Sequence, residues 1–219
     1  MKLIELSHTI ESGMPMFSSK APQPIIRPWM SHNEAATSGN YQDCTCEISE
    51  VSFVTSIGTY IDSPYHFDPS GKAIDELSLD QLILPGVIID CTKASKREAL
   101  HADTLENVSI KNNAVLFHTG WSRFWGKNEY YEYPFLASDT AQALLDGGAK
   151  MVGIDTLVID NMQDPIRPVH NILLKHGVLI VENLTNLHLL PKSGFTFHAA
   201  PLKIRKSAAF PIRAYAVSP

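Results

Sequence analysis

The chain has 219 residues, 44% of them hydrophobic, which suits a single domain spanning 1–219 with a full core. Its formal net charge of −5 gives no electrostatic case for a nucleic-acid partner, and no apolar run approaches the roughly 18 residues of a membrane span. Glu5 interrupts the apolar N-terminus, so no signal peptide is expected. Three cysteines without a matching pair for zinc predict reduced thiols in a cytoplasmic protein.

The first quarter of the chain mixes a regular and an irregular part. A short strand is predicted at 2–8. Residues 17–43 lack a regular period and contain scattered prolines and glycines, which is typical of an arm over a neighbouring molecule or a lid over a site. The pattern leaves both open. Residues 46–54 alternate apolar and polar side chains, which predicts a half-buried strand that leads into Gly58.

Most of the rest alternates buried strands with helices. Continuous apolar runs predict buried strands, and 3.6-residue spacing predicts helices. The predicted strands are 86–91, 114–119, 150–155, 178–182, 195–204 and 212–217; the predicted helices are 74–82, 138–148 and 168–176. Ser138 is the predicted cap of the second helix, and Pro168 stands in the first turn of the third. This order predicts an α/β fold with a mixed β-sheet core and flanking helices.

Asp62 and His66 flank Pro64 in the densest polar stretch of the chain. Pro64 is incompatible with a helix from Asp62 to His66, so both side chains are predicted on an irregular loop at a strand end. Sites are commonly built on such loops, but an aspartate before Ser-Pro is also an ordinary turn-former. These residues alone leave both interpretations open.

Two later residues supply partners. Glu182 ends the buried strand 178–182, and ligands of open α/β sheets bind beyond the carboxyl ends of the strands. An unpaired carboxylate there is costly, although Glu182 could also cap the residues that follow it. His170 lies early on the predicted helix 168–176 and by itself fits a structural histidine. Two carboxylates with one or two imidazoles suit a hard or borderline divalent ion.

The stretch from Ser56 to Phe67 reads Ser-Ile-Gly-Thr-Tyr-Ile-Asp-Ser-Pro-Tyr-His-Phe. It resembles the signature His-x-Gly-Thr-His-x-Asp-x-Pro-x-His-Phe of the cyclase-like family, which includes bacterial kynurenine formamidase and isatin hydrolase. Further likenesses run nearly end to end, at 5–10, 13–15, 119–121, 153–156, 169–170, 180–184, 201–204 and 211–214.

The resemblance implies the swivelling β/β/α architecture, a homo-oligomer (dimer or tetramer) and a small-molecule substrate. It implies a hydrolase of a small amide, ester or lactam bond, such as an arylformamidase in tryptophan catabolism to kynurenine. Carried over by position, Asp62, His170 and Glu182 match metal ligands, and His66 matches the general acid/base. Ser56 and Tyr60 stand where the family has the two leading histidines of its first metal site.

Three hypotheses follow from that departure. One divalent ion, zinc or manganese, remains on Asp62, His170 and Glu182 and assists water attack on a carbonyl. Alternatively the site works without metal, with His66 as base and Tyr60 donating to the oxyanion. In the third, the protein is inactive and binds a small molecule. Ser56 and Trp121 are candidate substrate contacts, although plain packing fits Trp121 equally well.

Overall fold

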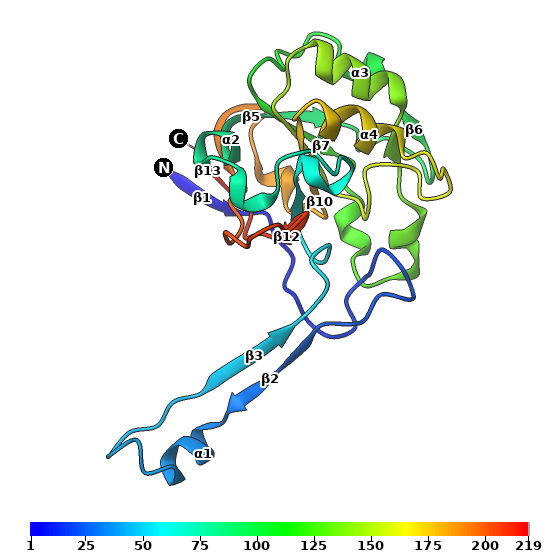
Figure 1. Cartoon of the computed structure of the whole chain (residues 1–219). Helices are drawn as coiled ribbons and strands as arrows, with labels where there is room; N and C mark the ends of the chain where they lie inside the picture. The colour runs from blue at the N-terminus through cyan, green and yellow to red at the C-terminus, as the bar shows by residue number, and fades with distance from the viewer. Residues whose placement is uncertain (219) are drawn as a thin grey trace.

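The computed structural model describes residues 1–218, and its main feature is a nine-stranded mixed sheet (Figure 1). The strand order is β1-β13-β11-β5-β7-β9-β10-β4-β12. The four central strands β5, β7, β9 and β10 run parallel, and the remaining neighbours pair antiparallel. The predicted α/β class with a mixed sheet and flanking helices is confirmed.

The elements have the following bounds. The strands are β1 (Lys2–Glu5), β2 (Ile25–Met30), β3 (Ile48–Ser52), β4 (Tyr60–Asp62), β5 (Ile83–Asp90), β6 (Ala99–Leu100), β7 (Ala114–His118), β8 (Phe135–Leu136), β9 (Met151–Ile154), β10 (Leu179–Glu182), β11 (Ser193–His198), β12 (Ala209–Pro211) and β13 (Tyr215–Ser218). The α-helices are α1 (His32–Thr37), α2 (Leu79–Leu82), α3 (Ser138–Asp146) and α4 (Pro168–Lys175). Single 3₁₀ turns occur at Pro64–His66, Ile74–Glu76, Ala102–Leu105, Trp121–Phe124, Asn128–Glu132 and Leu187–Leu189.

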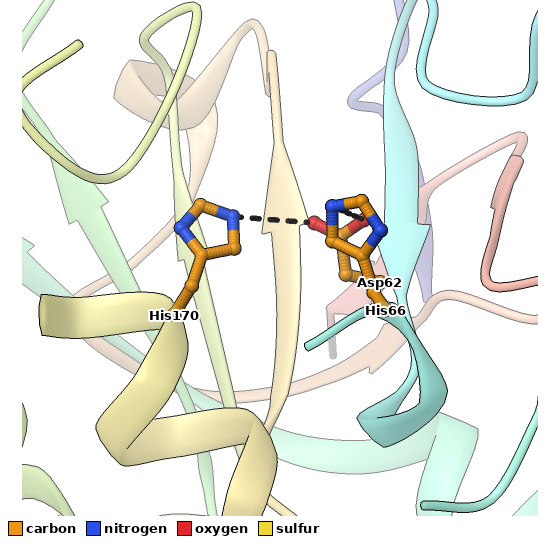
Figure 2. Close-up of side chains that lie close together, drawn as sticks. All are labelled: Asp62, His66 and His170. Atoms are coloured by element: carbon orange, nitrogen blue, oxygen red, sulfur yellow. Dashed lines mark ion pairs between the residues drawn. The ribbon is translucent and has the colours of Figure 1, made fainter. Parts of the chain in front are cut away.

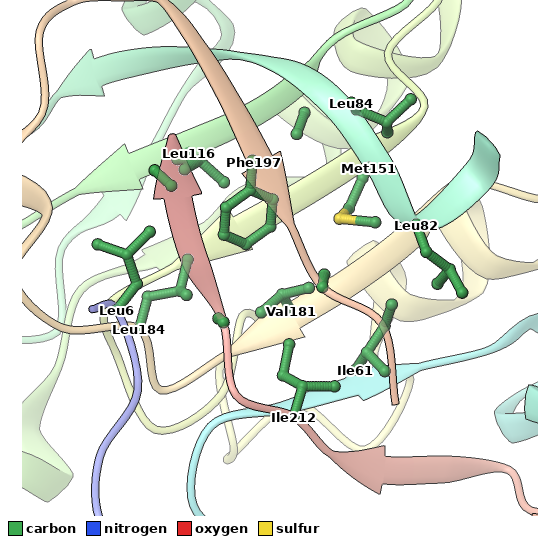
Figure 3. Packing of buried hydrophobic residues seen from close by; sticks show 14 of the residues in the cluster. Leu6, Ile61, Leu82, Leu84, Leu116, Met151, Val181, Leu184, Phe197 and Ile212 are labelled. Atoms are coloured by element: carbon green, nitrogen blue, oxygen red, sulfur yellow. The ribbon is translucent and has the colours of Figure 1, made fainter. Parts of the chain in front are cut away.

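The two faces of the sheet bury separate apolar clusters. Helices α3 and α4 lie against each other on one face, where Leu144 and Leu173 pack with Val115 and Ile180 of the parallel strands. On the other face the antiparallel strands curl over the centre, and Phe197 and Leu116 belong to one buried cluster (Figure 3). The central strands are therefore covered on both sides, which explains their continuous apolar runs.

Several predicted boundaries shift because strand pairing outweighs local signals. The strand predicted at 86–91 begins earlier, because β5 starts at Ile83 and includes Pro85. Pro85 is tolerated because it pairs only with β11, whereas the pairing with β7 begins one residue later. Ala137, not Ser138, is the N-cap of α3, and no side chain caps that helix.

An arm projects away from the body and carries the hairpin of β2 and β3 with α1 near its tip (Figure 1). The alternating pattern at 46–54 does form a strand, but β3 is largely exposed instead of half-buried, because only β2 pairs with it. The alternation of apolar and polar side chains along β3 reflects the two faces of a two-stranded ribbon. It does not mark a strand with one face against the core. Within residues 1–218, no helix has the length and hydropathy required to cross a bilayer.

Replacing Gly86 with alanine is expected to lower the free energy of unfolding by about 1–3 kcal/mol. Phe195 lies opposite Gly86 in the β5–β11 register, and a Cβ on Gly86 would overlap its ring. Urea unfolding measures the change. In a Phe195→Leu background the same substitution should cost less, and additive penalties in the double variant would contradict this explanation.

Candidate active site

The site is built where β4 pairs with β10. In this antiparallel register Tyr60 lies opposite Glu182, and Asp62 lies opposite Ile180. Tyr60 and Asp62 are two residues apart on one strand, so their side chains share a face. Glu182 is the last residue of β10, at the carboxyl edge of the parallel strands, as the sequence predicted.

The Glu182 carboxylate is fully buried and accepts two hydrogen bonds. The Tyr60 hydroxyl donates to Oε2, and the backbone N–H of Ile159 donates to Oε1 over 2.6 Å. Burial raises the pKa of the Glu182 carboxyl to about 7, against the opposing effect of the nearby His170 ring. Burial and the charge of Glu182 raise the pKa of Tyr60 well above its usual value, so the phenol keeps its proton as the donor.

His170 is oriented by a carboxylate that the sequence reasoning did not single out. Asp160 accepts from the backbone N–H groups of Val169 and His170, at 2.9 and 3.0 Å, and so satisfies the first turn of α4. Its Oδ2 also lies 2.6 Å from His170 Nδ1. Burial alone would lower the pKa of His170, but the hydrogen bond to Asp160 and the nearby carboxylates of Asp62 and Glu182 outweigh it and raise the pKa to about 10. The Nε2 atom is left facing the site.

Asp62 lies between two imidazoles (Figure 2). His66 Nε2 is 3.7 Å from Asp62 Oδ1, and His170 Nε2 is 3.8 Å from Asp62 Oδ2. Both separations exceed hydrogen-bonding distance. Neither Asp62 oxygen has a hydrogen-bond partner, although the side chain is completely buried. Phe67 stacks on the His170 ring, with 4.7 Å between ring centroids, and fixes its plane.

This geometry fits a metal ion. One ligand atom each from Asp62, His66 and His170 lies within 4.8 Å of the others. Around a tetrahedral ion with bonds of about 2.1 Å, neighbouring ligand atoms lie roughly 3.4 Å apart. Glu182 Oε1 is 3.5 Å from His170 Nε2, so Glu182 borders the same space. The orphaned Asp62 oxygens are what a positive ion would satisfy.

A cavity of about 400 Å³ opens onto His66, His170 and Glu182, whereas the completely buried Asp62 does not line it. Its lining includes five of the seven predicted site residues, namely Ser56, Tyr60, His66, His170 and Glu182. Trp121 does not line it: this indole is buried in a separate aromatic cluster and donates from Nε1 to the Glu129 carbonyl at 3.2 Å. A substrate contact by Trp121 stays a prediction.

Other residues complete the wall of the cavity. Phe17, Phe67, Val158 and Met162 provide apolar surface, and Arg167 provides a cation. Phe17 comes from the beginning of the segment predicted as an arm or lid. Nothing local in the sequence marks Arg167 or Asp160, although both lie in the loop that precedes His170.

The profile of a family described as putative cyclase matches residues 4–161, more than half of the chain. The chain belongs to this cyclase family. The predicted family membership is thereby confirmed.

Individual relatives agree with that assignment. A kynurenine formamidase of Bacillus mycoides (strain KBAB4) is 26% identical over 213 residues, which cover 96% of this chain and 95% of the relative. A solved structure described as a potential metal-dependent hydrolase with cyclase activity is 28% identical, with a TM-score of 0.80 and coverage of 98% and 96%. An isatin hydrolase bound to the product analogue thioisatinate has the same fold, with a TM-score of 0.88, 24% identity and coverage of 100% and 92%.

Replacing Tyr60 with phenylalanine is expected to lower the free energy of unfolding by about 1–3 kcal/mol, because one buried oxygen of Glu182 loses its donor. Chemical denaturation at neutral pH measures the loss. Tyr65→Phe is the matched control, since Tyr65 is 38% exposed, and it should change stability by less than about 0.5 kcal/mol. Equal effects of the two substitutions would refute the role given to the Tyr60 hydroxyl.

Proposed function

We propose that this cyclase-family protein hydrolyses a small amide bond, with the N-formyl amide of an aromatic amine as the substrate class. The observation that carries the proposal is the buried, unpartnered Asp62 carboxylate, which faces two imidazoles beside an apolar cavity. Kinship with relatives named kynurenine formamidase and metal-dependent hydrolase supports the same reaction type.

We assign one divalent ion, zinc or manganese, to Asp62, His170 and Glu182, a donor set that accepts either metal. Bound there, such an ion supplies Lewis-acid chemistry: it polarises a carbonyl and lowers the pKa of water. Asp160 supports this role from behind, because its bond to Nδ1 holds His170 with Nε2 directed at Asp62 and Glu182.

His66 moves the proton in this proposal. Its side chain is 31% exposed, whereas Asp62 and His170 are buried, so its ring reaches the substrate space of the cavity. It takes a proton from the attacking water and returns it to the leaving amine nitrogen. Phe17 and Phe67 form an apolar wall suited to an aryl group.

Tyr60 and Ser56 limit the site to a single ion in this proposal. The Tyr60 proton is engaged by Glu182, so this phenol neither ligates a second ion nor donates freely to a substrate oxyanion. The metal-free alternative would require that hydroxyl to leave Glu182, which would orphan a buried oxygen. The inactive small-molecule binder remains the second candidate, since the same cavity and apolar wall serve binding without turnover.

A screen of N-formyl aromatic amines, isatin-like lactams and simple lactones, with and without added Mn²⁺ or Zn²⁺, is expected to reveal turnover of formanilide-type substrates. Protein purified without chelator should carry one divalent ion per chain by elemental analysis. His66→Ala should keep that ion and lower kcat by about 10²–10⁴-fold, the usual contribution of a general acid/base.

His170→Ala is the comparison, because it should lose the ion. If His66→Ala also empties the site, His66 is a ligand and not the proton carrier. Unchanged turnover in His66→Ala would refute its assignment altogether. Protein that carries an ion but hydrolyses nothing in the screen would favour the binding alternative.

We also propose that the chain forms a homo-oligomer through its arm; the cytoplasmic location expected from its free thiols is kept as part of the proposal. Isolated two-stranded hairpins are marginally stable in water, yet β2 and β3 expose several large apolar side chains. These are Ile25, Ile26, Trp29, Ile48 and Val51, each at least 43% exposed. A second copy of the chain fits as the covering partner, since two-fold interfaces bury the same patch on both subunits.

The wild-type chain is therefore expected to be a dimer or tetramer by light scattering, and the Ile26→Lys, Val51→Glu double variant should dissociate. These two positions lie directly opposite in the hairpin, so the new charges can pair and keep the hairpin formed. The matched control exchanges the Arg27–Glu50 ion pair of the same hairpin, as Arg27→Glu with Glu50→Arg, which adds no charge at an apolar position and should keep the oligomer. A monomeric wild type would refute the oligomer.

A further inference from the structure

One permanent cation stands in the wall of the cavity. Arg167 lies in the residue position just before α4, and its half-buried side chain lines the same space as His66, His170 and Glu182. An arginine stays charged at every physiological pH. The groups that lie opposite this positive charge therefore influence which substrates bind in the cavity.

The backbone of Arg167 is held in an unusual conformation. Its φ of 51° and ψ of 59° are left-handed, a region that residues with a side chain seldom adopt. The Arg167 carbonyl accepts from the backbone N–H and the Nδ2 of Asn171, each at 3.1 Å, and Nη1 donates to the Asn161 carbonyl at 2.8 Å. The base of the side chain and one guanidinium nitrogen are thus fixed.

Asp62, Glu182 and Asp160, the acidic groups of the site, do not pair with Arg167. Asp62 faces the two histidines, Glu182 accepts from Tyr60 and Ile159, and Asp160 holds His170. None of the ion pairs formed within residues 1–218 includes Arg167. The hydrogen bond to the Asn161 carbonyl uses one of the five N–H donors of the guanidinium. The remaining donors form a planar fork suited to a carboxylate.

We propose that Arg167 is a specificity-determining residue that pairs with a carboxylate on the substrate. Together with the apolar wall of Phe17 and Phe67, it selects an aromatic amide that carries an anionic group away from the scissile bond. The proposal rests on the hydrolase function proposed above and narrows its substrate class to anionic aryl amides. Arg167 takes no part in the proton transfers.

The test compares N-formylanthranilate, which carries a carboxylate, with neutral formanilide in metal-loaded enzyme. Arg167→Gln is expected to lower kcat/KM for N-formylanthranilate by about 30-fold or more, mainly through KM, because a charged pair is lost. For formanilide the change should stay within about threefold. Arg167→Lys should fall between wild type and Arg167→Gln with the carboxylate substrate, because lysine keeps the charge but not the bidentate fork.

Lys175→Gln is the matched control. It removes one positive charge from the exposed end of the same helix, outside the cavity, and should leave both substrates unaffected. Equal losses on both substrates in Arg167→Gln, or a wild type without preference for the carboxylate, would overturn the proposal. Rescue by Arg167→Lys separates recognition of charge from damage to the loop.

Equilibrium binding measurements test the role of Arg167 separately from the proposed hydrolase function. Calorimetry of metal-loaded protein with 2-aminobenzoate and 2-aminobenzamide needs no turnover. Tighter binding of the carboxylate that disappears in Arg167→Gln supports the inference even if no amide is hydrolysed, in which case the proposed reaction fails alone. Carboxylate binding that is the same in wild type and Arg167→Gln overturns the inference even if hydrolysis is observed.

Discussion

The structure depends on the burial of two carboxylates at the junction of β4 and β10. Asp62 and Glu182 are both fully buried. Taking each charge out of water costs several kcal/mol unless hydrogen-bond donors or opposite charges offset that cost. Tyr60 and the Ile159 N–H offset the cost at Glu182, whereas Asp62 has only imidazoles nearby. A cation bound there would stabilise this arrangement, and stability would then depend on ligand binding at this junction.

Much of the fold was predictable because each central strand is buried on both faces. Such a strand requires a continuous run of apolar residues, which is visible in the sequence. The predictions that were wrong concern features that depend on pairing between distant segments. Pro85 is a local breaker, yet it lies in β5 because β11 pairs beside it. The strand at 48–52 has the period of a half-buried strand, but only tertiary structure reveals that nothing covers it.

The candidate site, like the fold, was predictable only in part. Asp62, His66, His170 and Glu182 stood out in the sequence, and the family resemblance gave them roles; the structure brings these four together. Asp160 and Arg167 were missed because their positions follow from the path of one loop, which bends back onto the first turn of α4. An irregular loop such as 155–167 carries no periodicity from which that path could be read.

The arm joins the body through two segments, and both contribute walls to the cavity. Phe17 and Ser18 precede β2, and Ser56 follows β3. Because the β2–β3 hairpin joins these two segments, a displacement of the arm would move both of these walls together. In the homo-oligomer proposed above, contacts of the arm with a second copy would therefore bear on the shape of the cavity as well as on assembly.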